Sequence, residues 1–195
     1  MDIEYIDTIK LKLEKSISNS LFNHCLGTAS EAEKLAKNYG INEEKAYVAG
    51  LLHDCGKNKS EKNDKNKKKD NLIHSQIGAH LAKEEYNISD EDIINAIKYH
   101  TTGRENMSLL EKIIFIADKI EPNRNYEGVD KLRKLAYDNI NESIVKCLEN
   151  TINYVKQRGL EFDVQSLKTL DYLISGGNKF ETKWKRYWNN FKSVW

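Results

Sequence analysis

The sequence predicts an all-α protein that folds as a compact helical bundle. It contains one proline, shows no sustained alternation of apolar and polar residues, and carries helix-capping signals along most of its length. With 195 residues, 39% of them hydrophobic, the chain can bury a core of its own. We therefore expect one domain over residues 1–177, with a charged segment at 58–70 and a separate tail at 178–195.

Three helices are expected in the first quarter of the chain. The first is amphipathic, and its apolar stripe is formed by Ile6, Ile9, Leu13 and Ile17. A second should run from Ser20 to Tyr39, because Gly40 is a typical C-terminal cap. Asn42 can then cap the N-terminus of a third helix, which contains the stretch AGLLHD.

Capping patterns predict where the later helices begin and end. Ser89 with Asp92 and Ser108 with Glu111 have the spacing of capping boxes, so a helix should begin at each. Pro122 should end the helix that contains Asp118. Three more helices are expected at residues 130–137, 141–158 and 164–175, with Gly159 and the Gly176–Gly177 pair as stops.

Two segments differ from the rest. Residues 58–70 contain no apolar side chain and carry six lysines against three acids, so we interpret them as a mobile loop, with His74 opening the helix that follows. The tail, FETKWKRYWNNFKSVW, combines three tryptophans with basic residues. Such a tail can form an amphipathic helix for a partner or membrane surface, or its aromatic rings can pack on the domain.

The charge and composition of the chain limit its expected cellular location and its expected binding partners. The 31 basic residues nearly balance the 30 acidic ones, which argues against binding to DNA or RNA through a general positive field. The N-terminus lacks the apolar core of a signal peptide and no run is long enough to span a membrane, so we expect a cytoplasmic protein. Three widely spaced cysteines without a CxxC pair argue against disulfides and a thiolate zinc site.

Polar side chains interrupt segments that otherwise read as buried helix. An unpaired carboxylate or histidine in an apolar interior is costly, and a bound divalent cation is a common reason for finding several of them there. We interpret His80 as an ordinary hydrogen-bonded core histidine, because it is turned about 240° from His74 on a helix. The remaining candidates for metal ligands are His24, His53, Asp54, His74, His100 and Asp118.

These six residues suffice for two ions. Adjacent helical residues point about 100° apart, so His53 and Asp54 cannot stack on one face but can flank one centre. The histidine would then bind one ion while the two oxygens of the Asp54 carboxylate bridge to a second. Two ions about 3.5–4 Å apart can activate water and bind a phosphoryl group.

The order of these residues resembles the HD-domain phosphohydrolases, an all-α superfamily of metal-dependent enzymes. The stretches LLHDCGK, LIHSQIGAHL and AIKYHTTGRENMSLLEKIIFIADKIEPNR further resemble the bacterial symmetrical diadenosine tetraphosphate hydrolases, the YqeK family. The similarity extends from about Leu21 to Leu173, and its most specific part is Ala96 to Arg124.

The resemblance implies a site with two divalent metal ions, iron first and manganese second, held by the same six residues. It also implies a dinucleoside polyphosphate substrate that is cut in its middle to release two ADP. Asp54, Lys57 and Arg124 are then the expected catalytic residues, because Lys57 and Arg124 match positions that meet phosphates. The expected substrate-binding residues are Lys57, Asn58, Thr101, Thr102, Arg104 and Arg124, with Gly103 in the same loop.

The working hypothesis is that a hydroxide held between the two ions attacks an inner phosphorus while Lys57 and Arg124 stabilise the developing charge. Another HD-domain enzyme, such as a nucleotidase or a guanosine tetraphosphate hydrolase, is the nearest alternative. A binding module that holds nucleotide or a partner without cleaving it is the second. The sequence is compatible with a homodimer but does not decide the oligomeric state.

Overall fold

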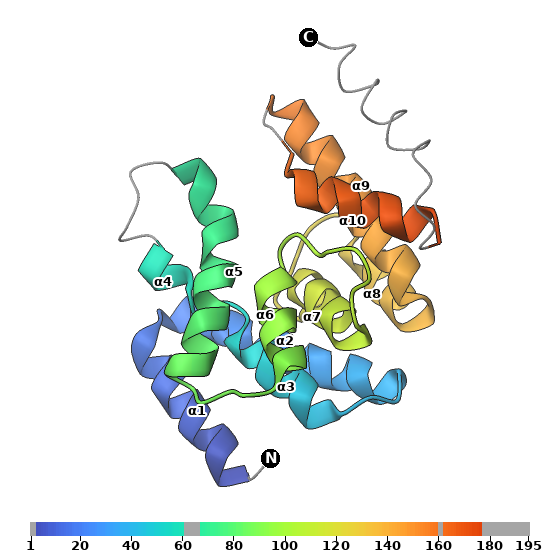
Figure 1. The fold of residues 1–195 in the computed structure, drawn as a ribbon. Helices are drawn as coiled ribbons and strands as arrows, with labels where there is room; N and C mark the ends of the chain where they lie inside the picture. The colour runs from blue at the N-terminus through green and yellow to red at the C-terminus, as the bar shows by residue number, and fades with distance from the viewer. Residues whose placement is uncertain (1–2, 61–66, 160–161, 177–195) are drawn as a thin grey trace.

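The computed structural model describes residues 3–60, 67–159 and 162–176, and within them it is built from helices without a strand (Figure 1). This confirms the predicted all-α class. The tail at 178–195 lies outside the described residues. In chain order the helices are α1 (Ile3–Ser16), α2 (Asn19–Asn38), α3 (Glu43–Leu52), α4 (Lys57–Ser60), α5 (Lys67–Glu84), α6 (Glu91–Tyr99), α7 (Leu109–Ile120), α8 (Val129–Asp138), α9 (Ile140–Gln157) and α10 (Val164–Ile174).

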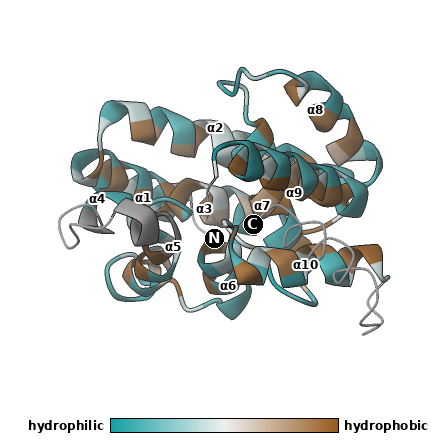
Figure 2. Cartoon of the chain, turned by 90° about the horizontal axis from the view of Figure 1, so that it is seen from above, coloured by the Kyte–Doolittle hydropathy of each residue, from teal (hydrophilic) through white to brown (hydrophobic). Residues whose placement is uncertain are grey.

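Helix α7 forms the centre of the bundle. Its apolar side chains are buried on all sides, which is expected for a helix that other helices surround. It contacts α2, α3, α6, α8 and α9, and α8–α10 lie on the side of the molecule away from α1, α4 and α5 (Figure 1). The outer helices carry apolar stripes on a largely polar surface, as α9 and α10 show in Figure 2.

Local capping explains most helix starts. Asn42 accepts a hydrogen bond from the Lys45 amide, and Ser108 forms the predicted capping box with Glu111. The box predicted at Ser89 is wrong, because Asp90 is the cap and accepts from the Asp92 amide. Its other carboxylate oxygen lies 2.6 Å from Lys45 Nζ, so the charged aspartate also links the start of α6 to α3.

Part of the segment 58–70, which was predicted to be a loop, is helical. The chain is helical in α4 up to Ser60 and again from Lys67, where α5 begins, while residues 61–66 lie outside the described part. His74 therefore lies well inside α5 rather than opening a helix. A polar composition argues against burial, but lysine and glutamate are good helix formers, and the apolar end of α5 packs on α6.

Two glycines allow the elements around the HD dipeptide to approach closely. A Cβ on Gly50 in α3 would lie 2.8 Å from Ala29 Cα in α2, and one on Gly56 would lie 2.3 Å from the carbonyl oxygen of His74 in α5. Both contacts are with backbone, which cannot move aside as a side chain can. The absence of a side chain at these positions therefore brings α2 and α5 against the turn that carries His53 and Asp54.

We predict that Gly56→Ala lowers the free energy of unfolding by about 1–3 kcal/mol, because the added methyl group overpacks a backbone contact. Gly78→Ala is the matched control on α5, since a Cβ there would lie 3.4 Å from its nearest neighbour. It should be neutral or stabilising through helix propensity. Urea unfolding of both variants measures the difference, and equal stabilities would contradict the packing argument.

No helix within the described ranges combines the length and apolar character needed to cross a bilayer.

Candidate metal centre

All six predicted ligands meet in one place in the bundle. His24 comes from α2, His74 from α5 and Asp118 from α7, while His53 and His100 are the C-terminal caps of α3 and α6. Five of the six are buried, and His24 is partly exposed. Polar residues from five helices therefore converge in the interior, where a set of uncompensated charges would be unstable.

Asp54 lies between two groups of ligand atoms. Its Oδ2 is 3.3 Å from His53 Nε2 and 3.6 Å from His24 Nε2. Its Oδ1 is 3.3 Å from His74 Nε2 and 3.6 Å from His100 Nε2. Each carboxylate oxygen thus faces its own pair of imidazole nitrogens, which is the arrangement expected of a carboxylate that bridges two ions.

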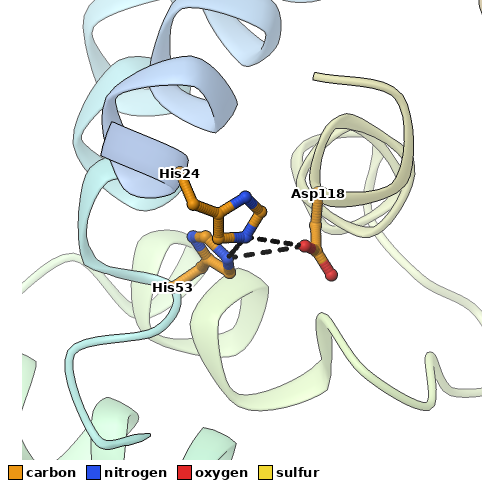
Figure 3. Close-up of side chains that lie close together, drawn as sticks. All are labelled: His24, His53 and Asp118. Carbon is orange, nitrogen blue, oxygen red and sulfur yellow. Dashed lines mark hydrogen bonds and ion pairs between the residues drawn. The ribbon is translucent and has the colours of Figure 1, made fainter. Parts of the chain in front are cut away.

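The histidine nitrogens within each pair lie close together. The Nε2 atoms of His24 and His53 are 3.2 Å apart, and those of His74 and His100 are also 3.2 Å apart. Asp118 Oδ1 completes the first pair, 3.0 Å from His24 Nε2 and 3.7 Å from His53 Nε2. Figure 3 shows both imidazoles turned toward this carboxylate. We call His24, His53 and Asp118 the first ligand group, and His74 and His100 the second.

These residues fit a metal site by the chemistry of their donor atoms. Asp54 Oδ1 is buried yet accepts no hydrogen bond from the described residues, so it has a free lone pair facing the second ligand group. Two triads of residues can each offer three donor atoms that lie within 4.8 Å of one another. One triad is His24, His53 and Asp118, and the other is His53, Asp54 and His100. Imidazole and carboxylate together suit iron, manganese or zinc.

Backbone contacts orient two of the histidines. His53 Nδ1 lies 2.7 Å from the carbonyl oxygen of Gly50, and His100 Nδ1 lies 2.7 Å from that of Ile97. A carbonyl can only accept a hydrogen bond, so Nδ1 must carry the proton in both rings. The Nε2 atom of each ring is then the one available to a metal.

The carboxylates dominate the electrostatics of the centre. Burial raises the pKa of Asp54, but the charge of His53 and the contact with His100 outweigh burial and hold the pKa below its usual range. Burial lowers the pKa of His53, yet Asp54 and Asp118 raise it to about 9. Burial also lowers the pKa of His100, to about 4, so this ring is neutral at pH 7.

Two predicted phosphate-binding residues lie at the same centre. Lys57 Nζ is 2.5 Å from Asp54 Oδ2, and Arg124 Nη2 is 2.7 Å from Asp118 Oδ1. Both side chains are more than a third exposed, so they lie between the buried ligands and solvent. Lys119, which the sequence analysis did not select, pairs with the other oxygen of Asp118.

The other predicted substrate-binding residues are placed differently. Thr101 Oγ1 lies 3.1 Å from His100 Nε2 and 3.4 Å from His74 Nε2, beside the second ligand group. The Thr102 hydroxyl donates to the Gly103 carbonyl, and Asn58 donates to the Ser16 carbonyl in α1. Arg104 binds both oxygens of Glu111, at 2.7 and 2.6 Å, and so joins the loop after α6 to α7.

One histidine was misjudged and one carboxylate was missed. His80 lies on the exposed side of α5, so it is a surface residue rather than the core residue that the sequence suggested. Glu121 is 2% exposed and its Oε1 is 3.2 Å from His24 Nδ1. Its place at the end of an apolar helix, three residues after Asp118, was the available signal.

The fold and the site define a member of the HD domain family. The model of that family matches residues 21–123, which is more than half of the chain, and the chain belongs to this family. Its predicted resemblance is confirmed by relatives that bear the name symmetrical bis(5'-nucleosyl)-tetraphosphatase. One from Halalkalibacterium halodurans is 40% identical over 78% of this chain and 88% of its own length. One from Bacillus subtilis is 32% identical, over 84% and 95% respectively.

A solved structure supports the same family assignment. A protein from Clostridium acetobutylicum, described as a predicted HD superfamily hydrolase involved in NAD metabolism, superposes with a TM-score of 0.80 at 39% identity. The match covers 87% of this chain and 97% of that protein. Together with the HD domain, these relatives support a metal-dependent nucleotide hydrolase.

We predict that the metal-free protein loses thermal stability as pH rises from about 6.5 to about 9. A histidine with a raised pKa stabilises the fold fully below its unfolded pKa, and this contribution is lost as the pH passes the folded value of about 9. Calorimetry in the presence of a chelator should show the melting temperature falling across this window. His53→Gln should lack this slope, and a wild-type melting temperature that stays constant would contradict it.

Proposed function

We propose that the protein hydrolyses diadenosine tetraphosphate symmetrically and releases two molecules of ADP. The observation that carries this proposal is the position of Asp54, whose two oxygens each face a separate pair of histidine nitrogens. Such a pair of subsites suits the two inner phosphates of a four-phosphate chain. The names of the relatives that align over most of their own lengths support the same substrate.

The first ligand group would hold one ion and the second ligand group the other, with Asp54 shared between them. Bound there, two divalent ions would activate water at neutral pH and neutralise charge on the phosphates. Iron is the first candidate and manganese the second, because both accept mixed imidazole and carboxylate ligands. An HD-domain enzyme that binds a single ion would not need His74 and His100 as ligands, so their presence favours two ions.

Lys57 and Arg124 are proposed to bind the polyphosphate. In the structure described here each contacts a ligand carboxylate, Asp54 or Asp118, and so offsets the negative charge of the centre. Once cations compensate those carboxylates, the same side chains can turn their donors to phosphate oxygens at the rim. An arginine fork suits two oxygens of one phosphate, whereas lysine acts as a point charge.

The reaction itself needs no side-chain nucleophile. Water adds to one inner phosphorus, and the bond from that phosphorus to the central bridging oxygen breaks, so both products are ADP. Lys57 and Arg124 stabilise the charge that builds on the phosphate oxygens. The Thr101 hydroxyl, beside the second ligand group, is placed to donate to a phosphate oxygen there.

Product analysis tests the proposal. Anaerobic incubation of the purified protein with Fe(II) and diadenosine tetraphosphate, followed by chromatography, should yield ADP as the sole nucleotide product, and a chelator should stop its formation. Formation of AMP with ATP would contradict cleavage at the middle of the chain. Absence of any product from metal-loaded protein would favour a different phosphorylated substrate.

Two variants separate metal binding from phosphate binding. Asp54→Asn should lose both activity and metal, because the shared ligand loses its charge. Lys57→Met should keep its metal content but lose about 10²–10³-fold in kcat, as expected when one donor to a developing charge is removed. A Lys57→Met protein with unchanged kcat would exclude Lys57 from the reaction.

A further inference from the structure

Glu121 is a buried carboxylate that the proposed reaction does not use. It follows α7 directly and is 2% exposed. Its Oε2 accepts the backbone N–H of Asn123 at 2.7 Å, which holds the carboxylate in place. Its Oε1 faces His24 Nδ1 at 3.2 Å. Both oxygens are therefore engaged, one by the backbone and the other by a histidine of the first ligand group.

The contact with Glu121 fixes which nitrogen of His24 is available. An ionised carboxylate can only accept a hydrogen bond, so His24 Nδ1 carries the proton and Nε2 is left for an ion. His53 and His100 achieve the same result with neutral backbone carbonyls. His24 differs from these two rings in having a charged partner, which increases the basicity of the imidazole as a ligand.

The neighbouring helix is shaped to admit this carboxylate. A Cβ on Gly27, one turn after His24 in α2, would lie 2.5 Å from Glu121 Oε2. The Nε atom of Arg124 is 3.9 Å from Glu121 Oε1, too far for a good hydrogen bond. Among the described residues, His24 is thus the side chain within hydrogen-bonding distance of Glu121 Oε1.

Carboxylates are distributed unequally over the two ligand groups. The first ligand group contains the Asp118 carboxylate and has Glu121 behind His24. The second ligand group consists of two histidines and contains no carboxylate of its own. Asp54 is shared by both groups. Cations offset the negative charge of the first group, because Lys119 and Arg124 pair with Asp118, and Lys57 pairs with the Asp54 oxygen that faces this group. The contact between Glu121 and His24, rather than net charge, therefore distinguishes the first group.

We propose that Glu121 is a positioning residue that orients His24 for the ion at the first ligand group. This inference rests on the proposed two-ion function and adds to it that the affinity of the first ligand group, His24, His53 and Asp118, for its ion depends on Glu121. Glu121 acts through His24 and does not itself contact an ion.

Titration with Mn²⁺ tests this directly. Calorimetry on the full chain should resolve two binding steps for the wild type. Glu121→Gln keeps the size of the side chain and removes its charge, so one of the two steps should weaken by about 10–100-fold while the other stays unchanged. Glu127→Gln is the matched control, since Glu127 is exposed on the same loop and should titrate like the wild type.

The outcomes distinguish the inference from the proposed function. Two Mn²⁺ ions in the wild type with an unchanged Glu121→Gln titration would overturn the role of Glu121 and leave the two-ion function standing. Fewer than two ions in the wild type would overturn both. If Glu121→Gln does not fold, NMR of the Zn²⁺-loaded wild type decides: a slowly exchanging proton on His24 Nδ1 supports the inference, and a proton on Nε2 contradicts it.

Discussion

The buried carboxylate of Asp54 is the constraint on which the rest of the site depends. It is 1% exposed, and one of its oxygens accepts no hydrogen bond from the described residues. A carboxylate in such a position needs positive charge on both sides. In the structure this charge comes from His53 and Lys57, and in the proposed working state it comes from ions.

Helix ends and close backbone contacts bring the ligands to Asp54. His53 and His100 cap the C-termini of α3 and α6, where the helix dipoles favour cations and a backbone carbonyl three residues earlier orients each ring. Gly56 lets α5 approach the turn after α3, which places His74 beside Asp54. Rigid helical elements thus hold the site, so little reorganisation is needed when ions bind.

Much of the fold and of the candidate site was predictable from the sequence, because the interactions that form them are local. Capping at Asn42 and Ser108 depends on residues three positions apart, and the six predicted ligands are polar interruptions of apolar helices. The cap at Asp90 was missed because two adjacent residues could both cap. The helical residues 58–60 and 67–70 were misread as loop because composition reports burial, not helicity. Glu121 and Gly56 could not be assigned from sequence, because their roles depend on contacts with α2 and α5.

The most direct test of this account is the position of the ions themselves. Anomalous diffraction from crystals grown with Mn²⁺ should show two peaks about 3.5–4 Å apart. One should lie against His24, His53 and Asp118, the other against His74 and His100, with Asp54 between them. A single peak, or two peaks without Asp54 between them, would contradict the claim that this carboxylate joins two metal subsites.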